Sequence, residues 1–69
     1  MHNNIRIETA RAALARAAWV RGATPAYGED DVTDLLADIR HLCRAADIDF
    51  DRCDRVAAMH FEAENGGAS

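Results

Sequence analysis

The chain has 69 residues, enough for one small domain, and a net charge of −4 with eight arginines and no lysine. A domain of this size buries only about 60% of its unfolded surface, so a core of its own is marginal without a partner, a metal or a disulfide. The negative charge argues against binding to a nucleic-acid backbone, and no run of residues is long and apolar enough to span a membrane. Because MHNNIRIE lacks the apolar core of a signal peptide, we expect a cytoplasmic protein with reduced cysteines.

The first predicted helix covers residues 5–21. Its ARAALARAAWVR segment is rich in strong helix formers, and either Asn3 or Asn4 is placed to cap its start. Gly22 stands where a helix commonly ends, and Pro25 in the following GATPAYGED segment prevents the helix from continuing.

The second and third predicted helices cover residues 31–46 and 50–64. Asp30 is the expected N-cap of the second helix and Asp49 of the third, with Ile48 and Cys53 spaced as a hydrophobic staple. Their apolar residues recur at helical spacing and define two inner faces. These positions are Val32, Leu35, Leu36, Ile39, Leu42, Cys43 and Ala46 on the second helix, and Phe50, Cys53, Val56, Ala57, His60 and Phe61 on the third.

The segment between these two helices is short, which predicts an antiparallel hairpin. We therefore expect an all-α fold, a small three-helix domain that takes up residues 1–69, with residues 65–69 as a disordered tail.

The first helix carries two apolar strips, which a monomer of three helices cannot easily bury together. Ile7, Ala10, Leu14, Ala17 and Ala18 are expected to pack on the hairpin. The other strip consists of Ile5, Ala12, Ala15 and Trp19, which we call the outer strip. Two interpretations stay open: Trp19 folds over the loop around Tyr27, or the outer strip is a self-association surface that forms a homodimer.

An acidic face runs along the second predicted helix. Asp31, Asp34, Asp38 and His41 share it at spacings of three and four residues. Carboxylates at this spacing suit Mg²⁺ or Mn²⁺, but the same pattern is typical of a solvated helix face, and a partner-binding face is the third alternative. The metal interpretation is the minority one, so no metal or cofactor is expected.

Cys43 and Cys53 lie at equal distances from Ile48, so the hairpin would bring their side chains towards each other, with His60 two turns beyond Cys53. The spacing matches no zinc signature, and two small buried apolar residues are the simpler interpretation. No serine precedes Ser69, and no carboxylate is placed to orient His60, so no catalytic residue is expected.

Residues 31–64 carry DLLADIRHLC, DIDFDRC and RVAAMHFEAE. This pattern resembles a group of short uncharacterised helical proteins of proteobacteria, their phages and integrated elements, which has no activity to carry over. Asp31-Val32-Thr33-Asp34 is also weakly similar to the E-x-x-D helix of MazG-like nucleotide pyrophosphohydrolases, an all-α family that holds Mg²⁺ between two half-sites. Because the other half-site, E-E-x-x-E, has no counterpart, this second resemblance implies at most a helical, dimeric architecture or a weakly held ion.

These observations together favour a small helical interaction or regulatory accessory protein. We expect it to be no enzyme and to bind neither nucleic acid nor a membrane. Phage or mobile-element origin follows from the resemblance, and an unidentified protein partner from the spare surfaces. The alternative is a metal-binding or degenerate pyrophosphohydrolase-like protein that uses the acidic face.

Overall fold

Three helices make up the computed structural model of the protein, which describes residues 2–66, with the side chains of residues 2 and 3 excepted. They are α1 (His2–Arg21), α2 (Glu29–Ala46) and α3 (Phe50–Glu64), and no strand occurs in this part of the chain. The predicted all-α, three-helix fold class is confirmed. None of these helices is long and apolar enough to cross a membrane.

Helix α1 begins at His2, three residues before its predicted start. Asn3 and Asn4 therefore lie within the helix, and the prediction that one of them caps it is wrong. The predicted end at Gly22 is confirmed, because Gly22 has a φ of 74°. The Gly22 amide donates a hydrogen bond to the Trp19 carbonyl at 3.1 Å, and the Ala23 amide donates one to the Ala18 carbonyl at 2.8 Å. This is the Schellman pattern, which satisfies the last carbonyls of a helix.

Helix α2 begins two residues earlier than predicted, because Gly28 rather than Asp30 is its N-cap. The Asp31 carboxylate, on the third helical residue, accepts a hydrogen bond of 2.9 Å from the Gly28 amide. The three acids of the first turn also suit the positive end of the helix dipole. The acidic residues therefore stabilise the start of α2 as helical residues of its first turn, and not as the N-cap.

A tight turn at residues 47–49 joins α2 to α3. Asp47 has a φ of 59°, and the Ile48 amide donates to the Cys43 carbonyl at 2.8 Å, which closes α2 with a second Schellman pattern. Asp49 then caps α3 as predicted, by accepting a hydrogen bond of 3.0 Å from the Arg52 amide. Both ends of the turn are thus specified by local backbone chemistry.

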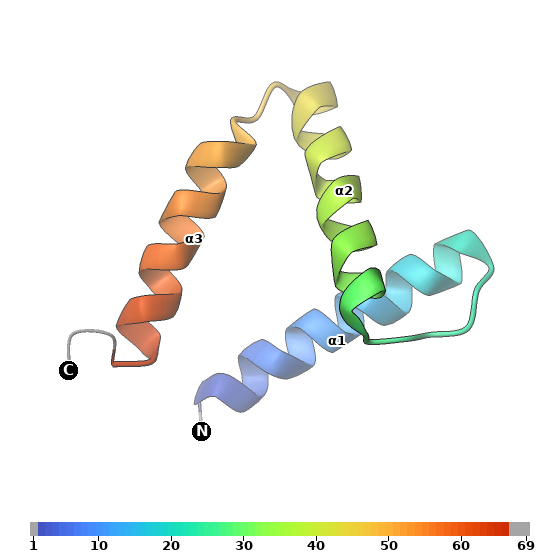
Figure 1. Ribbon diagram of the computed structural model, residues 1–69, viewed down its shortest axis with the longest axis horizontal. Helices are drawn as coiled ribbons and strands as arrows, with labels where there is room; N and C mark the ends of the chain where they lie inside the picture. Colours follow the sequence, from blue (N-terminus) through green and yellow to red (C-terminus); the bar gives the residue numbers. More distant parts are fainter. Residues whose placement is uncertain (1, 67–69) are drawn as a thin grey trace.

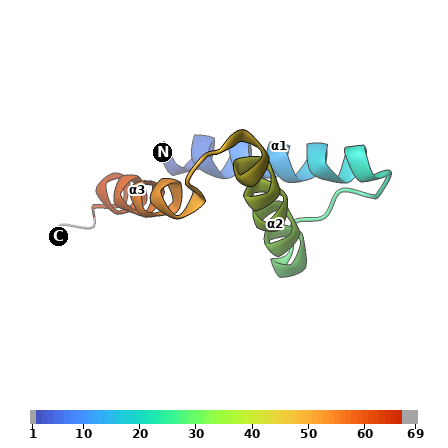
Figure 2. The same cartoon turned by 90° about the horizontal axis from the view of Figure 1, so that it is seen from above.

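From this turn α2 and α3 diverge, while α1 crosses the other end of α2 and brings its N-terminus near the C-terminal end of α3 (Figure 1). Viewed from above, the three helices do not gather around one axis (Figure 2). The Cα atoms extend only 17 Å along the shortest axis, which is less than two helix diameters. The α2–α3 hairpin is therefore open, with its two helices splayed apart, and α1 lies across the end away from the turn.

This arrangement covers few apolar side chains. Among the described residues only Leu14 and Cys43 are buried, and α3 has no buried residue. Ala17, Ala18, Leu35 and Ile39 are half-buried, which places the core where α1 crosses α2. Phe50, at the start of α3, is also half-buried, with the Arg40 guanidinium over its ring. The expectation that both inner faces are covered is wrong for the remaining positions. Ile7, Ala10, Val32, Leu36, Leu42, Ala46, Cys53, Val56, Ala57, His60 and Phe61 are all exposed.

Candidate interaction surfaces

A groove of about 560 Å³ lies between the first turns of α1 and the last turns of α3. We call it the α1–α3 groove. Arg6, Ile7, Ala57, His60, Phe61, Glu64 and Asn65 line it. Ala57, His60 and Phe61 come from the apolar face of α3, at helical spacings of three and four residues. The face that the sequence marks for burial is thus the face that opens into this groove.

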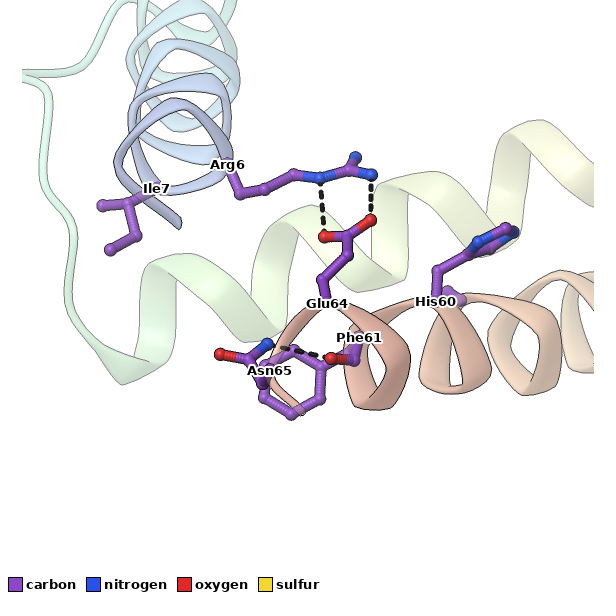
Figure 3. Close-up of a pocket in the computed structure, with 7 residues that line it drawn as sticks. Arg6, Ile7, His60, Phe61, Glu64 and Asn65 are labelled. Atoms are coloured by element: carbon purple, nitrogen blue, oxygen red, sulfur yellow. Dashed lines mark hydrogen bonds and ion pairs between the residues drawn. The ribbon is translucent and has the colours of Figure 1, made fainter. Parts of the chain in front are cut away.

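The Arg6 side chain crosses from α1 to Glu64 on α3 and closes one side of the groove (Figure 3). Its Nε donates to the Glu64 carboxylate at 3.0 Å, and a terminal nitrogen donates to the second carboxylate oxygen. The hydrogen bond and the charge of Glu64 both raise the pKa of Arg6 above its ordinary value. Both side chains are accessible to water, so this pair positions the end of α3 more than it stabilises the fold.

The groove presents more apolar than polar surface, although Arg6, His60, Glu64 and Asn65 also line it, and it is open to solvent. Phe61 is 66% exposed and Ile7 is 50% exposed. The Phe61 carbonyl accepts a hydrogen bond from the Asn65 side chain at 2.9 Å, which fixes the last turn of α3 (Figure 3). A small ligand normally has 70–90% of its surface buried in its pocket, so this groove is better suited to an apolar helix face than to an enclosed small molecule.

The outer strip lies on another face of α1. Ile5 is 72% exposed, Trp19 is 67% exposed and Ala12 is exposed, whereas Ala15 is half-buried. The interpretation in which Trp19 folds over the loop around Tyr27 is therefore wrong, because this side chain is exposed. Instead, the guanidinium carbon of Arg16 lies 4.1 Å from the centre of the Trp19 ring, and Arg11 lies 5.7 Å from that of Tyr27. The self-association interpretation of this strip stays a prediction.

The acidic face of α2 does not assemble into a cluster of ligands. Asp31 caps the helix through Gly28, and Asp38 forms an ion pair with Arg21 of α1. Asp34 and His41 are exposed on the same helix. Within the described part of the chain, no three side chains from His, Cys, Asp and Glu lie close enough together to hold a metal ion. The geometry gives Asp31 and Asp38 structural roles.

Cys43 is buried and Cys53 is exposed, and both are free thiols. The interpretation of both as buried apolar residues is thus right for Cys43 and wrong for Cys53. The reason is the divergence of α3, which carries Cys53 and His60 away from cover. No sequence pattern predicts the Arg6–Glu64 contact, because the two residues are 58 positions apart.

A comparison with models of known protein families finds no match to this chain, and comparisons with curated proteins and with solved structures find none either. The resemblances of residues 31–64 therefore stay predictions, and the function has to be argued from the surfaces.

Proposed function

We propose that this protein is a small helical interaction protein, an accessory or regulatory factor without a catalytic step, which acts by binding other polypeptides. The observation that carries the proposal is the imbalance between covered and uncovered apolar residues. Two are buried in the described part of the chain, while twelve large apolar side chains are exposed. Contiguous exposed apolar patches are typical of interaction sites, and two of these side chains, Ile7 and Phe61, line one groove.

The helices themselves are well specified, which separates this chain from a disordered one. Each has its own end signals, such as the Asp49 cap and the Gly22 and Asp47 turns. Amphipathic helices that are capped at their ends but make few packing contacts gain most of their stability from the surface that covers their apolar face. A polypeptide partner supplies such a surface.

The proposed partners are a second copy of the chain and an unidentified target protein. The outer strip is the contact for self-association that the sequence predicts, and its exposure is compatible with that role. The resemblance of residues 31–64 to short proteins of phages and integrated elements supports an accessory role in such an element. Among the described residues, no group of His, Cys, Asp and Glu side chains supports the alternative of a metal-binding protein.

Unfolding of the dilute chain tests this proposal. At low micromolar concentration we expect weakly cooperative unfolding, because few apolar contacts need to break. The unfolding temperature should rise with the concentration of the chain or of a partner, because a partner that binds only the folded state stabilises it. A compact domain of this length would instead show a heat-capacity change of about 0.8–1.0 kcal/mol/K whatever its concentration. That result in dilute solution would contradict the proposal.

A further inference from the structure

We infer that the α1–α3 groove is a self-association site that takes the apolar face of α3 from a second copy of this chain, each copy filling the groove of the other. This inference rests on the proposed function and specifies its first partner. It differs from self-association through the outer strip, which leaves the groove open.

The exposed area of the chain is the first argument. The chain exposes 5943 Å², whereas a compact monomer of 7.6 kDa exposes about 4,300 Å². Its radius of gyration is 13.6 Å, against about 11 Å for a compact domain of 69 residues. The difference between the two areas is about 1,600 Å² per chain.

A stable dimer needs an area of this size. Two copies that cover the excess would together bury more than about 2,000 Å², which is where obligate homodimer interfaces begin. The outer strip offers only two large side chains, Ile5 and Trp19, and they are separated by about four helical turns. The groove instead brings Ile7 of α1 together with Ala57 and Phe61 of α3.

The second argument is self-complementarity. In a twofold dimer the same patch of both chains forms the interface, so it has to provide both the groove and the helix face that fills the partner's groove. The groove is bounded by α3, whose exposed Val56, Ala57 and Phe61 form one face of a helix. That helix has 15 residues, a length of about 22 Å, and none of its residues is buried by the other two helices. Placing two such faces side by side covers both.

Charge distinguishes a second copy from a basic target protein. Each chain has a net charge of −4, so two copies repel weakly, and salt screens this repulsion. Self-association through an apolar groove should therefore strengthen as salt is added. Binding of a basic target would weaken under the same conditions.

Sedimentation equilibrium on two neighbouring substitutions tests the site. Ala57→Glu places a carboxylate in the groove, whereas Ala58→Glu places the same group one residue further along an exposed helix and outside the groove. Both alanines are exposed, so neither substitution disturbs a buried position. We expect Ala57→Glu to raise the dissociation constant of the dimer by at least about 100-fold, and Ala58→Glu to change it by less than about threefold.

A second pair removes side chains instead of adding charge. Phe61 and Met59 are 66% and 69% exposed on α3, but only Phe61 lines the groove. We expect Phe61→Ala to weaken the dimer at least about 30-fold, since the loss occurs in both copies, while Met59→Ala and Trp19→Ala leave it within about threefold. Helicity measured by circular dichroism on the same samples shows that each variant still folds.

The outcomes separate the inference from the proposed function. A dimer that Trp19→Ala dissociates and Ala57→Glu spares overturns the groove assignment but keeps the protein as a self-associating one. A wild-type chain that stays monomeric at high concentration also overturns the inference. If that monomer unfolds without cooperativity, the proposed function stands with a foreign partner; if it unfolds as a compact domain, both fail.

Discussion

The corner where α1 crosses α2 and the length of α3 beyond the turn both carry apolar residues at helical spacing, yet these residues end in opposite environments. At the corner, Leu14 is buried, Leu35 and Ile39 are half-buried, and Asp38 pairs with Arg21. Along α3 no residue is buried, and contact with α1 is made by the Glu64 carboxylate at its far end. An amphipathic pattern thus shows that a helix face needs cover, but it does not show whether the same chain supplies it.

The largest effect is expected from Leu14, which is one of the two buried apolar residues in the described chain. Leu14→Ala should lower the free energy of unfolding by about 2–3 kcal/mol, because it removes buried methyl groups and leaves a cavity. Urea unfolding followed by circular dichroism measures this. In dilute solution Phe61→Ala should change the unfolding free energy far less. Equal losses from both variants would mean that α3 is already covered in the monomer.

Hydrogen exchange sharpens the same comparison along the chain. In dilute solution we expect the amides around Leu14 and Ile39 to be the best protected, and those of residues 53–61 to exchange quickly, because local opening of α3 exposes little new apolar surface. Raising the concentration of the chain should slow exchange in α3 selectively. Uniform protection of all three helices at every concentration would contradict the distinction between the two regions.

The start of α3 depends on a single side chain. Asp49→Ala removes the carboxylate that accepts a hydrogen bond from the Arg52 amide, and it should destabilise the chain by about 1 kcal/mol. Asp49→Asn keeps an acceptor oxygen and serves as the control, with a loss that should be clearly smaller. Thermal unfolding of the wild type and the two variants at one concentration makes the comparison. Equal unfolding temperatures for Asp49→Ala and Asp49→Asn would show that the cap hydrogen bond does not contribute to stability.

A smaller and opposite effect is expected at the end of α2. Asp47 has a φ of 59°, in the left-handed region where glycine carries no steric penalty. Asp47→Gly should therefore stabilise the chain by about 0.5 kcal/mol, as the relief of strain exceeds the added freedom of the unfolded chain. Asp47→Ala keeps a side chain in the left-handed region and therefore keeps the steric strain, so this variant should not be more stable than the wild type. The midpoint of urea unfolding measures both variants.

The weakest contact should be the Arg6–Glu64 pair, because both side chains are exposed to water. Arg6→Ala should leave the unfolding midpoint within experimental error and should speed exchange only in the last turn of α3. A large loss of stability would show instead that the pair contributes substantially to the stability of the fold.

Local chemistry in the sequence settled the number of helices, the end of α1 at Gly22 and the start of α3 at Asp49. These features depend on residues within about four positions of one another, so a single sequence suffices to predict them. The start of α2 was missed by two residues, because both Asp30 and Asp31 suit a helix start and only the geometry shows that Asp31 reaches back to Gly28.

Only the tertiary structure decided which apolar faces are covered. The spacing of Val56, Ala57 and Phe61 marks a face for burial, but the angle at which α3 leaves the turn determines what that face meets. The Arg6–Glu64 contact and the groove beside it join residues from the two ends of the chain, which no local pattern relates. Periodicity is a property of one helix, whereas burial is a property of the space between helices, and here many of the large apolar side chains stay exposed.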